Sequence, residues 1–420
     1  MKKKIILLTA AVLIASIGLI GGGLAKDAAS ADDGADVLLE EYKSDIVPVY
    51  PAKSQTVNIL KETVRDYIGA MKAVQPENDY YFNDYSIYKY KDGTDIHIDD
   101  FFNGGVNLQA SKKLALVWEN NTNDDISEYK VSISLKQDLS NPIVLTTTDT
   151  YATVENLYAG TEYYWQVKSS DGTKSSPVFN FKTEEGYRML STNDIMNVRD
   201  LGGRMTESGK RVKQGLIYRG GEINSITYVD DSSGGTHHAN LDEHSRSVFL
   251  DTMGVKVELD FRGDAEANNQ TKSNLSDEID YVRASIPAYT ECYKDYARAN
   301  YATIFRTFLT ADQKPVYFHC WGGADRTGTV GFLLNGLLGV SYTDLLIDYE
   351  LTSFSKNLRA KEDIANDSYP FTMFVEGLQA NYGTPSNKIS DCVENYLKTF
   401  VGLTDDEITQ LKTVMLEEVQ

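Results

Sequence analysis

Apolar and polar residues alternate in short runs between about residues 104 and 185, which is the pattern of half-buried β-strands. The runs are rich in β-branched and aromatic residues, and Asn, Asp and Gly separate them. This region is therefore predicted to fold as an antiparallel, all-β sandwich. The predicted strands are KLALVWEN, EYKVSISLK, NPIVLTTT, YATVENL, EYYWQVKSSD and PVFNFKT.

From about residue 187 to residue 420, strand-like and helix-like segments alternate. KVELDF and PVYFHC have the length and composition of buried strands, whereas longer segments carry apolar residues at helical spacing. This alternation predicts an α/β domain with a central, mostly parallel sheet flanked by helices. The helical segments are YATIFRTFLT, TGTVGFLLNGLLG and DEITQLKTVMLEEV.

Residues 32–103 are acidic and rich in tyrosine. Within them, VNILKETVRDYIGAMKAV has apolar residues at helical spacing and predicts one amphipathic helix. We expect a packing or spacer element here rather than a site. The apolar positions are Ile59, Leu60, Val64, Ile68 and Met71.

The N-terminus has the pattern of a secretion signal over residues 1–31. Lys2 to Lys4 precede an apolar stretch from Ile5 to Ala25, and Ala29-Ser30-Ala31 supplies the small residues that signal peptidases accept. The stretch is also long enough to span a bilayer, so an uncleaved anchor is the alternative. Either way, we expect the remaining chain to work outside the cytoplasm, secreted or at the cell surface.

Charge and cysteine content narrow the function further. A net charge of −20 disfavours nucleic acid or an anionic membrane as the main partner, so any anionic ligand must be held by a local site. Cys292, Cys320 and Cys392 show neither the even count nor the spacing of a disulfide framework or a zinc site. At least one thiol is therefore available for chemistry.

The segment VYFHCWGGADRTGTVGF places Cys320 where a strand ends and a helix begins. Gly322 and Gly323 permit a tight turn whose backbone N–H groups point inward, and the start of a helix near Arg326 adds a positive end. Such a loop suits a tetrahedral anion such as phosphate. A thiol in this position ionises readily, and an arginine guanidinium grips two phosphoryl oxygens at once. Cys320 and Arg326, with five residues between them, are thus a predicted nucleophile and anion clamp.

These residues resemble a known family. HCWGGADRTG is similar to the phosphate loop of the atypical bacterial protein-tyrosine phosphatases, and four more motifs agree in order. The resemblance covers roughly Asp194 to the C-terminus, within an α/β region that we assign to residues 187–420, and it implies the cysteine-phosphatase fold. The four motifs are NVRDLGG (197–203), GLIYRGGEI (215–223), ELDFRGDAE (258–266) and LGVSYTDLLIDYELTS (338–353).

The sandwich region resembles a fibronectin type III domain, with the immunoglobulin-like fold that this implies. Trp118 lies in an early strand, and a leucine, a glycine turn and a tyrosine corner follow as in that family. A spacer that braces the enzyme is the expected role, and an adhesive or carbohydrate-binding module is the alternative. The residues that carry the later motif are Leu157, Gly160, Thr161, Tyr163 and Val167.

The phosphatase resemblance implies phosphoryl transfer through a phosphocysteine on Cys320, stabilised by Arg326 and the loop amides, with neither metal nor organic cofactor. A carboxylic acid must protonate the leaving group. Asp325 is the first candidate, Asp200 the second and Asp264 the third. Asp325 could instead accept helix hydrogen bonds, and Asp200 could pin the turn at Gly202 and Gly203. The residues assigned to phosphate binding are Trp321, Gly322, Gly323, Ala324, Asp325 and Arg326.

Other residues around the loop receive supporting roles. His319 is expected to orient the loop and tune Cys320 rather than act as a base. Thr327 either donates its hydroxyl to the departing thiolate or caps the helix. Arg199 either lines the site or forms an ion pair. Trp321 either stacks on an aromatic ester or covers a helix face.

For three further residues a chemical role is only the alternative. Cys292 is expected to be a buried, unreactive thiol, with a protective disulfide to Cys320 as the alternative. His237 and His238 lie in a polar insertion, DSSGGTHHANLDE, where metal binding is a minor alternative.

The sequence thus predicts a secreted bacterial phosphatase that acts on phosphotyrosine-like monoesters, on a phosphorylated protein or on a small molecule. Inositol phosphates or phosphoinositides are the alternative substrates, but Ala324 replaces the lysine usual in this family and removes a positive charge from the rim of the loop. A catalytically silent phosphate-binding or adhesion protein is the second alternative, which the presence of Cys320, Asp325 and Arg326 disfavours.

Overall fold

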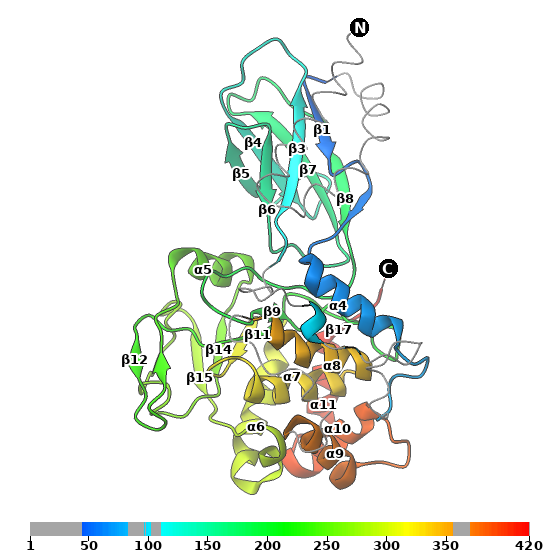
Figure 1. The fold of residues 1–420 in the computed structure, drawn as a ribbon, viewed down its shortest axis with the longest axis vertical. Coiled ribbons are helices and arrows are strands. Elements are labelled where there is room, and N and C mark those ends of the chain that lie inside the picture. Colours follow the sequence, from blue (N-terminus) through cyan, green and yellow to red (C-terminus); the bar gives the residue numbers. More distant parts are fainter. Residues whose placement is uncertain (1–43, 83–95, 97, 102–110, 356–369, 420) are drawn as a thin grey trace. The chain divides into compact units, whose positions relative to one another are not determined.

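The computed structural model describes residues 44–82, 96, 98–101, 111–355 and 370–419 of the 420-residue chain (Figure 1). These residues form two compact units: unit 1 takes its residues from 1–62 and 112–185, and unit 2 from 63–111 and 186–420. The predicted signal segment, residues 1–31, lies outside the described residues. Within the described part of the chain, no helix is both long and apolar enough to cross a membrane.

Unit 1 is a sandwich of two sheets. One sheet has the strand order β1-β3-β6, and the other has the order β2-β8-β7-β4-β5. The strands predicted from the alternating pattern are all present: β3 (Leu114–Asn120), β4 (Tyr129–Ser134), β5 (Ile143–Thr147), β6 (Tyr151–Val154), β7 (Glu162–Ser169) and β8 (Phe179–Thr183).

Two further strands of the sandwich come from before the predicted boundary at residue 104. β1 (Ile46–Tyr50) pairs antiparallel with β3, and β2 (Gln55–Val57) pairs parallel with β8. Pro48 interrupts β1 and every residue of β1 is buried, so the strand has no alternating pattern to reveal it. The sandwich therefore begins earlier than the sequence pattern indicates.

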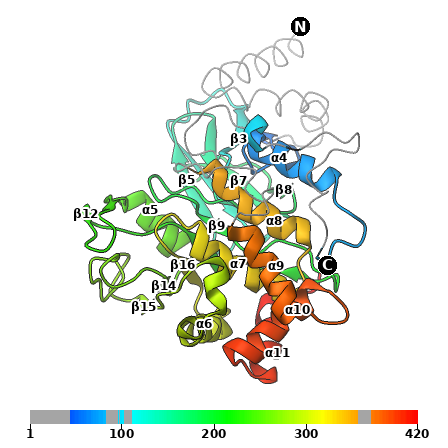
Figure 2. The same ribbon diagram turned by 60° about the horizontal axis from the view of Figure 1, so that its bottom comes forward.

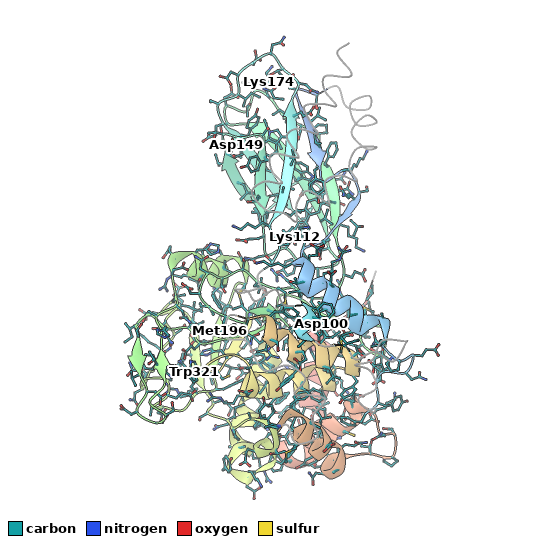
Figure 3. The ribbon with its side chains drawn as sticks, viewed as in Figure 1. Asp100, Lys112, Asp149, Lys174, Met196 and Trp321 are labelled. Carbon is teal, nitrogen blue, oxygen red and sulfur yellow. The ribbon has the colours of Figure 1, made fainter. Side chains whose placement is uncertain are left out.

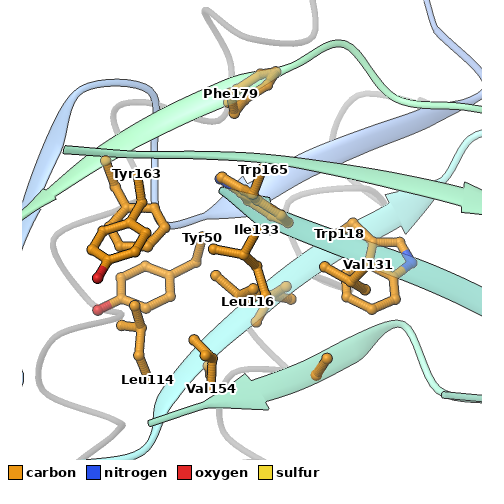
Figure 4. Packing of buried hydrophobic residues seen from close by; sticks show 14 of the residues in the cluster. Tyr50, Leu114, Leu116, Trp118, Val131, Ile133, Val154, Tyr163, Trp165 and Phe179 are labelled. Atoms are coloured by element: carbon orange, nitrogen blue, oxygen red, sulfur yellow. The ribbon is translucent and has the colours of Figure 1, made fainter. Parts of the chain in front are cut away.

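The core of the sandwich is built on two tryptophans. Trp118 and Trp165 are both 0% exposed and pack among aliphatic and aromatic side chains from the two sheets (Figure 4). The hydroxyl of Tyr163 accepts a hydrogen bond from the backbone N–H of Tyr158 at 2.8 Å. This bond is the tyrosine corner expected for a sandwich of this kind.

Unit 2 contains a five-stranded sheet in the order β15-β14-β16-β11-β9. β15, β14, β16 and β11 run parallel to one another, and the short edge strand β9 is antiparallel to β11. The predicted mostly parallel sheet is thus present. The strand bounds are β9 (Arg199–Asp200), β11 (Ile217–Gly220), β14 (Val257–Asp260), β15 (Asp280–Arg283) and β16 (Val316–His319), with short pairs β10 (Arg211–Val212) and β17 (Leu416–Glu417), and β12 (Tyr228–Val229) and β13 (Thr236–His237).

Helical segments cover both faces of this sheet. Adjacent residues of β16 point to opposite faces. Tyr317 packs on Phe249, just after α5 (Glu243–Ser247), whereas Phe318 packs on Phe308, just after α6 (Asp295–Thr307). In Figures 1 and 2, α7 to α11 form one group and α5 lies apart from them. The helices are α5 (Glu243–Ser247), α6 (Asp295–Thr307), α7 (Asp325–Leu337), α8 (Tyr342–Glu350), α9 (Pro370–Tyr382), α10 (Ile389–Tyr396) and α11 (Asp405–Met415).

The predicted amphipathic helix is α4 (Glu62–Ala73), which packs on unit 2 although it precedes the sandwich in the sequence. Its buried Tyr67 contacts Phe354, and Lys72 Nζ lies 2.6 Å from Asp344 Oδ2. Residues 32–103 therefore do not form a separate segment, because their described parts divide between the two units. Helical periodicity indicates an apolar face but not the surface that covers it.

Candidate active site

Three parallel strands bring their carboxyl ends together in unit 2. β16 leads into Cys320, β11 leads into Gly221 and Glu222, and β14 leads into Arg262 and Glu266. Gly220 and Asp260, which end the two flanking strands, are both in register with His319. Loops at the carboxyl edge of a parallel sheet are the usual place for a ligand. The motifs noted in the sequence therefore meet at one edge.

The turn after Cys320 requires glycine at one position. Gly323 has φ +66°, and a Cβ atom there would lie 2.2 Å from the carbonyl oxygen of Gly220. Both the left-handed backbone and this close approach exclude a larger residue. Gly323 thus allows the loop to pack directly against the end of β11.

The carbonyl groups of the loop are held on its outer side. Trp321 O accepts from the backbone N–H of Glu222 at 2.9 Å, and the side-chain amide of Asn197 donates to Gly322 O and Gly323 O at 3.1 and 2.8 Å. Arg219 Nη2 also donates to Gly323 O, at 2.8 Å. The loop is therefore clamped from behind by groups on other segments.

The backbone N–H groups of the same loop are left for an external acceptor. Those of Trp321, Gly322, Gly323 and Ala324 donate to no acceptor within the residues that the structure describes. Helix α7 begins directly afterwards, at Asp325, and adds the positive end of its dipole. The arrangement is a cup of donors suited to an anion.

Cys320 and Arg326 lie at the two ends of this cup. Cys320 is a free thiol with 3% of its surface exposed. Arg326 makes two parallel hydrogen bonds to Glu266, with Nη1–Oε2 2.7 Å and Nη2–Oε1 2.6 Å. Burial lowers the pKa of Arg326, but Glu266 and the Cys320 sulfur outweigh burial and leave that pKa raised. The guanidinium is thus permanently charged and held in one orientation.

Asp325 lies at the first position of α7 and is exposed. Its carboxylate accepts a hydrogen bond from the hydroxyl of Tyr289, which also lies 2.8 Å from the hydroxyl of Tyr349. Tyr289 lies outside the motifs that resemble the family, and it was not predicted as part of the site. Asp325 is thus an exposed carboxyl group at the start of the helix, held by a phenol.

The second and third acid candidates are engaged elsewhere. Asp200 is fully buried, and it accepts from Gly202 N and Gly215 N at 2.8 Å each and pairs with Arg188 at 3.1 Å. This is the turn-pinning role that the sequence left open. Asp264 pairs with Arg283 at 2.7 Å.

Arg199 belongs to an ionic cluster around Asp348. The Asp348 carboxylate lies 2.9 Å from Arg199 and from Arg204, and 2.6 Å from Arg219. Burial raises the pKa of Asp348, but the three guanidinium groups outweigh it and hold that pKa well below its usual range. Arg199 thus forms an ion pair, which was one of its two predicted roles. The arginine of this cluster that contacts the loop is Arg219, which was not predicted from the sequence.

His319 supports the loop from the end of β16. Its Nε2 lies 3.0 Å from Glu258 Oε1 and its Nδ1 lies 3.1 Å from the carbonyl oxygen of Cys320. Burial lowers the pKa of His319, but Asp260 and Glu258 outweigh it and raise that pKa above its ordinary value. This placement fits the predicted orienting role.

Thr327 does not cap the helix. The N-cap of α7 is Ala324, with no side-chain cap hydrogen bond, and the buried hydroxyl of Thr327 has no hydrogen-bond partner within the described residues. The capping alternative therefore has no support from the geometry.

One group of side chains has ligand atoms close enough for a metal ion among the described residues: Glu258, Asp260 and His319, within 4.8 Å of one another. Arg262 binds the Asp260 carboxylate through Nε and Nη2, at 2.9 and 2.7 Å. The Arg262 guanidinium thus already provides a positive charge to Asp260, and Glu258 is bound by His319. His237 is bound to Glu222 and Asp230, and Cys292 is a buried free thiol whose pKa is raised by burial.

The comparisons with known families agree with these motifs. Residues 190–417, more than half of the chain, match the model of the tyrosine phosphatase family, and residues 105–181 match the model of the fibronectin type III domain. The chain belongs to the tyrosine phosphatase family. The resemblance drawn from the motifs is thereby confirmed, and so is that of the sandwich region.

Individual relatives match the catalytic part. A protein of Cupriavidus necator with the provisional name tyrosine-protein phosphatase is 30% identical over 189 residues, which cover 39% of this chain and 63% of the relative. A tyrosine-protein phosphatase of Nostoc commune is 24% identical over 198 residues, covering 39% of this chain and 67% of the relative. The chain thus spans about two thirds of the length of either relative.

Among solved structures, the core catalytic domain of the PP-IP phosphatase SIW14 from S. cerevisiae, in complex with citrate, matches with 15% identity. The match covers 46% of this chain and 98% of that domain, with a TM-score of 0.27. A likeness of this size carries no conclusion about fold or substrate.

Proposed function

We propose that the chain is a cysteine-dependent phosphatase that hydrolyses phosphotyrosine-like monoesters through a phosphocysteine intermediate. The observation that carries the proposal is the loop itself: Cys320 begins it, its carbonyl groups are tied outward to Glu222, Asn197 and Arg219, and a charged Arg326 ends it. This combination provides a nucleophile, amide donors and a bidentate cation around one centre.

In the first chemical step, the Cys320 thiolate attacks phosphorus in line with the leaving oxygen. The S–P bond forms as the P–O bond breaks, and Asp325 transfers a proton to the departing oxygen. The loop amides and Arg326 stabilise the charge on the three equatorial oxygens. The substrate alcohol or phenol then leaves, and the phosphocysteine remains.

In the second step, a water molecule attacks the phosphocysteine and the S–P bond breaks. Asp325, now ionised, accepts the proton of the water, and the sulfur departs as a thiolate. Thr327, whose buried hydroxyl has no partner among the described residues, is available to donate to that thiolate. Inorganic phosphate then leaves, and the enzyme regains its starting state.

The chain is expected to act outside the cytoplasm, since residues 1–31 have the pattern of a cleaved signal. N-terminal sequencing of the protein recovered from the culture medium or cell surface of an expressing bacterium tests this part. A new N-terminus near residue 32 is the expected result, and a cytoplasmic product with an intact N-terminus would contradict it.

The activity is tested with a panel of substrates: 4-nitrophenyl phosphate, a phosphotyrosine peptide, the matching phosphoserine peptide and inositol hexakisphosphate. Hydrolysis of the aryl esters in EDTA, loss of turnover in Cys320→Ser and inhibition by vanadate are expected. A preference for the inositol phosphate would shift the substrate class, and a folded wild-type protein without turnover would leave only a phosphate-binding role.

A further inference from the structure

Three aromatic rings pack in series at the loop: Tyr228 and His237 are stacked, and His237 and Trp321 are tilted. The ring centroids of Trp321 and His237 are 5.0 Å apart at an interplanar angle of 36°, and those of His237 and Tyr228 are 4.8 Å apart at 1°. Trp321 is 40% exposed, whereas His237 is 0% exposed. This aromatic stack, Tyr228–His237–Trp321, therefore has a buried middle ring and an exposed end ring on the residue that follows the nucleophile.

The middle ring is fixed by carboxylates on both sides. His237 Nδ1 lies 2.5 Å from Glu222 Oε2, and Nε2 lies 3.2 Å from Asp230 Oδ2. Asp230 itself closes the β12–β13 hairpin by accepting from Ser232 N at 2.8 Å and from Ser233 N at 2.7 Å. The plane of His237 is thus set by two hydrogen-bonding partners, and it presents a rigid face to the indole.

The stack is also tied to the residues of the phosphate loop. Tyr228 Oη accepts from Arg262 at 2.9 Å and donates to Glu266 O at 3.0 Å, and Glu266 holds Arg326. The backbone N–H of Glu222 donates to Trp321 O. The backbone of Trp321 is therefore held by Glu222, and its ring packs against His237. Figure 3 labels Trp321 in unit 2.

We propose that the aromatic stack is a platform that selects an aryl leaving group, with Trp321 as the contact and His237 as a positioning residue behind it. The inference rests on the proposed function. A monoester whose phosphoryl group occupies the loop must send its leaving group out past the neighbouring residues, and a fixed, exposed indole offers a phenyl ring an offset or edge contact. Contacts of this kind are worth roughly 3- to 10-fold in affinity.

Kinetics with matched phosphotyrosine and phosphoserine peptides test the proposal. In Trp321→Ala, the ratio of kcat/KM for the aryl over the alkyl peptide is expected to fall about 3- to 10-fold, mostly through KM, and Trp321→Phe should restore most of it. His237→Ala should change the ratio in the same direction. Val229→Ala, which removes an exposed apolar side chain from the same hairpin, is the matched control and should leave the ratio as in the wild type.

A binding measurement distinguishes contact from a merely structural role. The chain has three tryptophans, and the other two, Trp118 and Trp165, are 0% exposed, so acrylamide should quench Trp321 selectively. In Cys320→Ser, the phosphotyrosine peptide should protect Trp321 from acrylamide, and the phosphoserine peptide should protect it less.

Equal protection by both peptides, or a Trp321→Ala variant with an unchanged aryl-to-alkyl ratio, would overturn the platform while the phosphatase assignment stands. A wild-type protein that hydrolyses neither peptide nor 4-nitrophenyl phosphate would overturn the proposed function instead.

Discussion

The Glu266 carboxylate holds the Arg326 guanidinium through two parallel hydrogen bonds, of 2.7 and 2.6 Å. A guanidinium that clamps phosphate must be oriented before the substrate arrives, because misplacement by about 1 Å costs about 100-fold in rate. Glu266→Gln keeps the shape but removes the charge and one acceptor, so kcat/KM for 4-nitrophenyl phosphate should fall about 10- to 100-fold. Glu278→Gln changes an exposed glutamate and is the control; equal activity of the two variants would refute the orienting role.

Gly323 and Gly322 are adjacent but meet different surroundings. A Cβ at position 323 would lie 2.2 Å from Gly220 O on a backbone with φ +66°, whereas a Cβ at 322 would meet nothing within 4 Å. Gly323→Ala should therefore distort the loop and reduce kcat/KM about 100-fold or more, and Gly322→Ala should cause a much smaller loss. Steady-state kinetics and circular dichroism measure the two effects. Similar losses would show that the close approach to β11 does not shape the loop.

Asp325 is the proposed acid, so the loss of rate on its removal should depend on the leaving group of the substrate. Alkyl esters need protonation of the departing oxygen, whereas 4-nitrophenolate leaves without it. In Asp325→Asn, kcat for the phosphoserine peptide should fall about 10²- to 10⁴-fold, with a far smaller change for 4-nitrophenyl phosphate. An equal loss on both substrates would assign Asp325 another role.

Replacing Asp200 should lower the stability of the fold rather than slow the departure of the leaving group. Its carboxylate is buried against Arg188 and accepts from two backbone N–H groups. Asp200→Asn leaves that arginine without its full counter-charge and should lower the free energy of unfolding by about 3–5 kcal/mol. Denaturant titration beside the exposed control Asp312→Asn measures this. A stable Asp200→Asn variant that loses only its alkyl-ester activity would instead make Asp200 the acid.

His319 should make stability depend on pH. Although burial opposes it, Asp260 and Glu258 raise the pKa of His319 above its ordinary value of 6.5. Protonation is thus stronger in the folded state, and the stabilisation is complete below pH 6.5 and is lost as pH rises through the folded pKa. Across pH 5.5 to 9, the Tm of the wild type should fall relative to that of His319→Gln. Parallel Tm profiles would exclude this contribution.

Local pattern was sufficient for those elements whose apolar residues recur at a regular spacing. The six predicted sandwich strands, the strand before Cys320 and the helix after it are all present, because alternation and helical spacing depend on which face of each segment is buried. β1 was not predicted, because Pro48 and the burial of every residue remove the alternation of apolar and polar positions. The helix α4 was predicted, but its packing on unit 2 was not, because an apolar stripe does not identify the surface that covers it.

For the site, the sequence by itself determined the chemistry that Cys320, Asp325 and Arg326 offer and the family to which their motif belongs, because a thiol, an acid and a guanidinium at this spacing after a strand share one turn. Only the tertiary structure decided which distant groups hold them. Glu266 on Arg326, Asn197 and Arg219 behind the loop, and His237 behind Trp321 come from segments up to 126 residues away, brought together at the carboxyl edge of one sheet. The physical reason is that such contacts depend on how strands are ordered in the sheet, which local spacing does not encode.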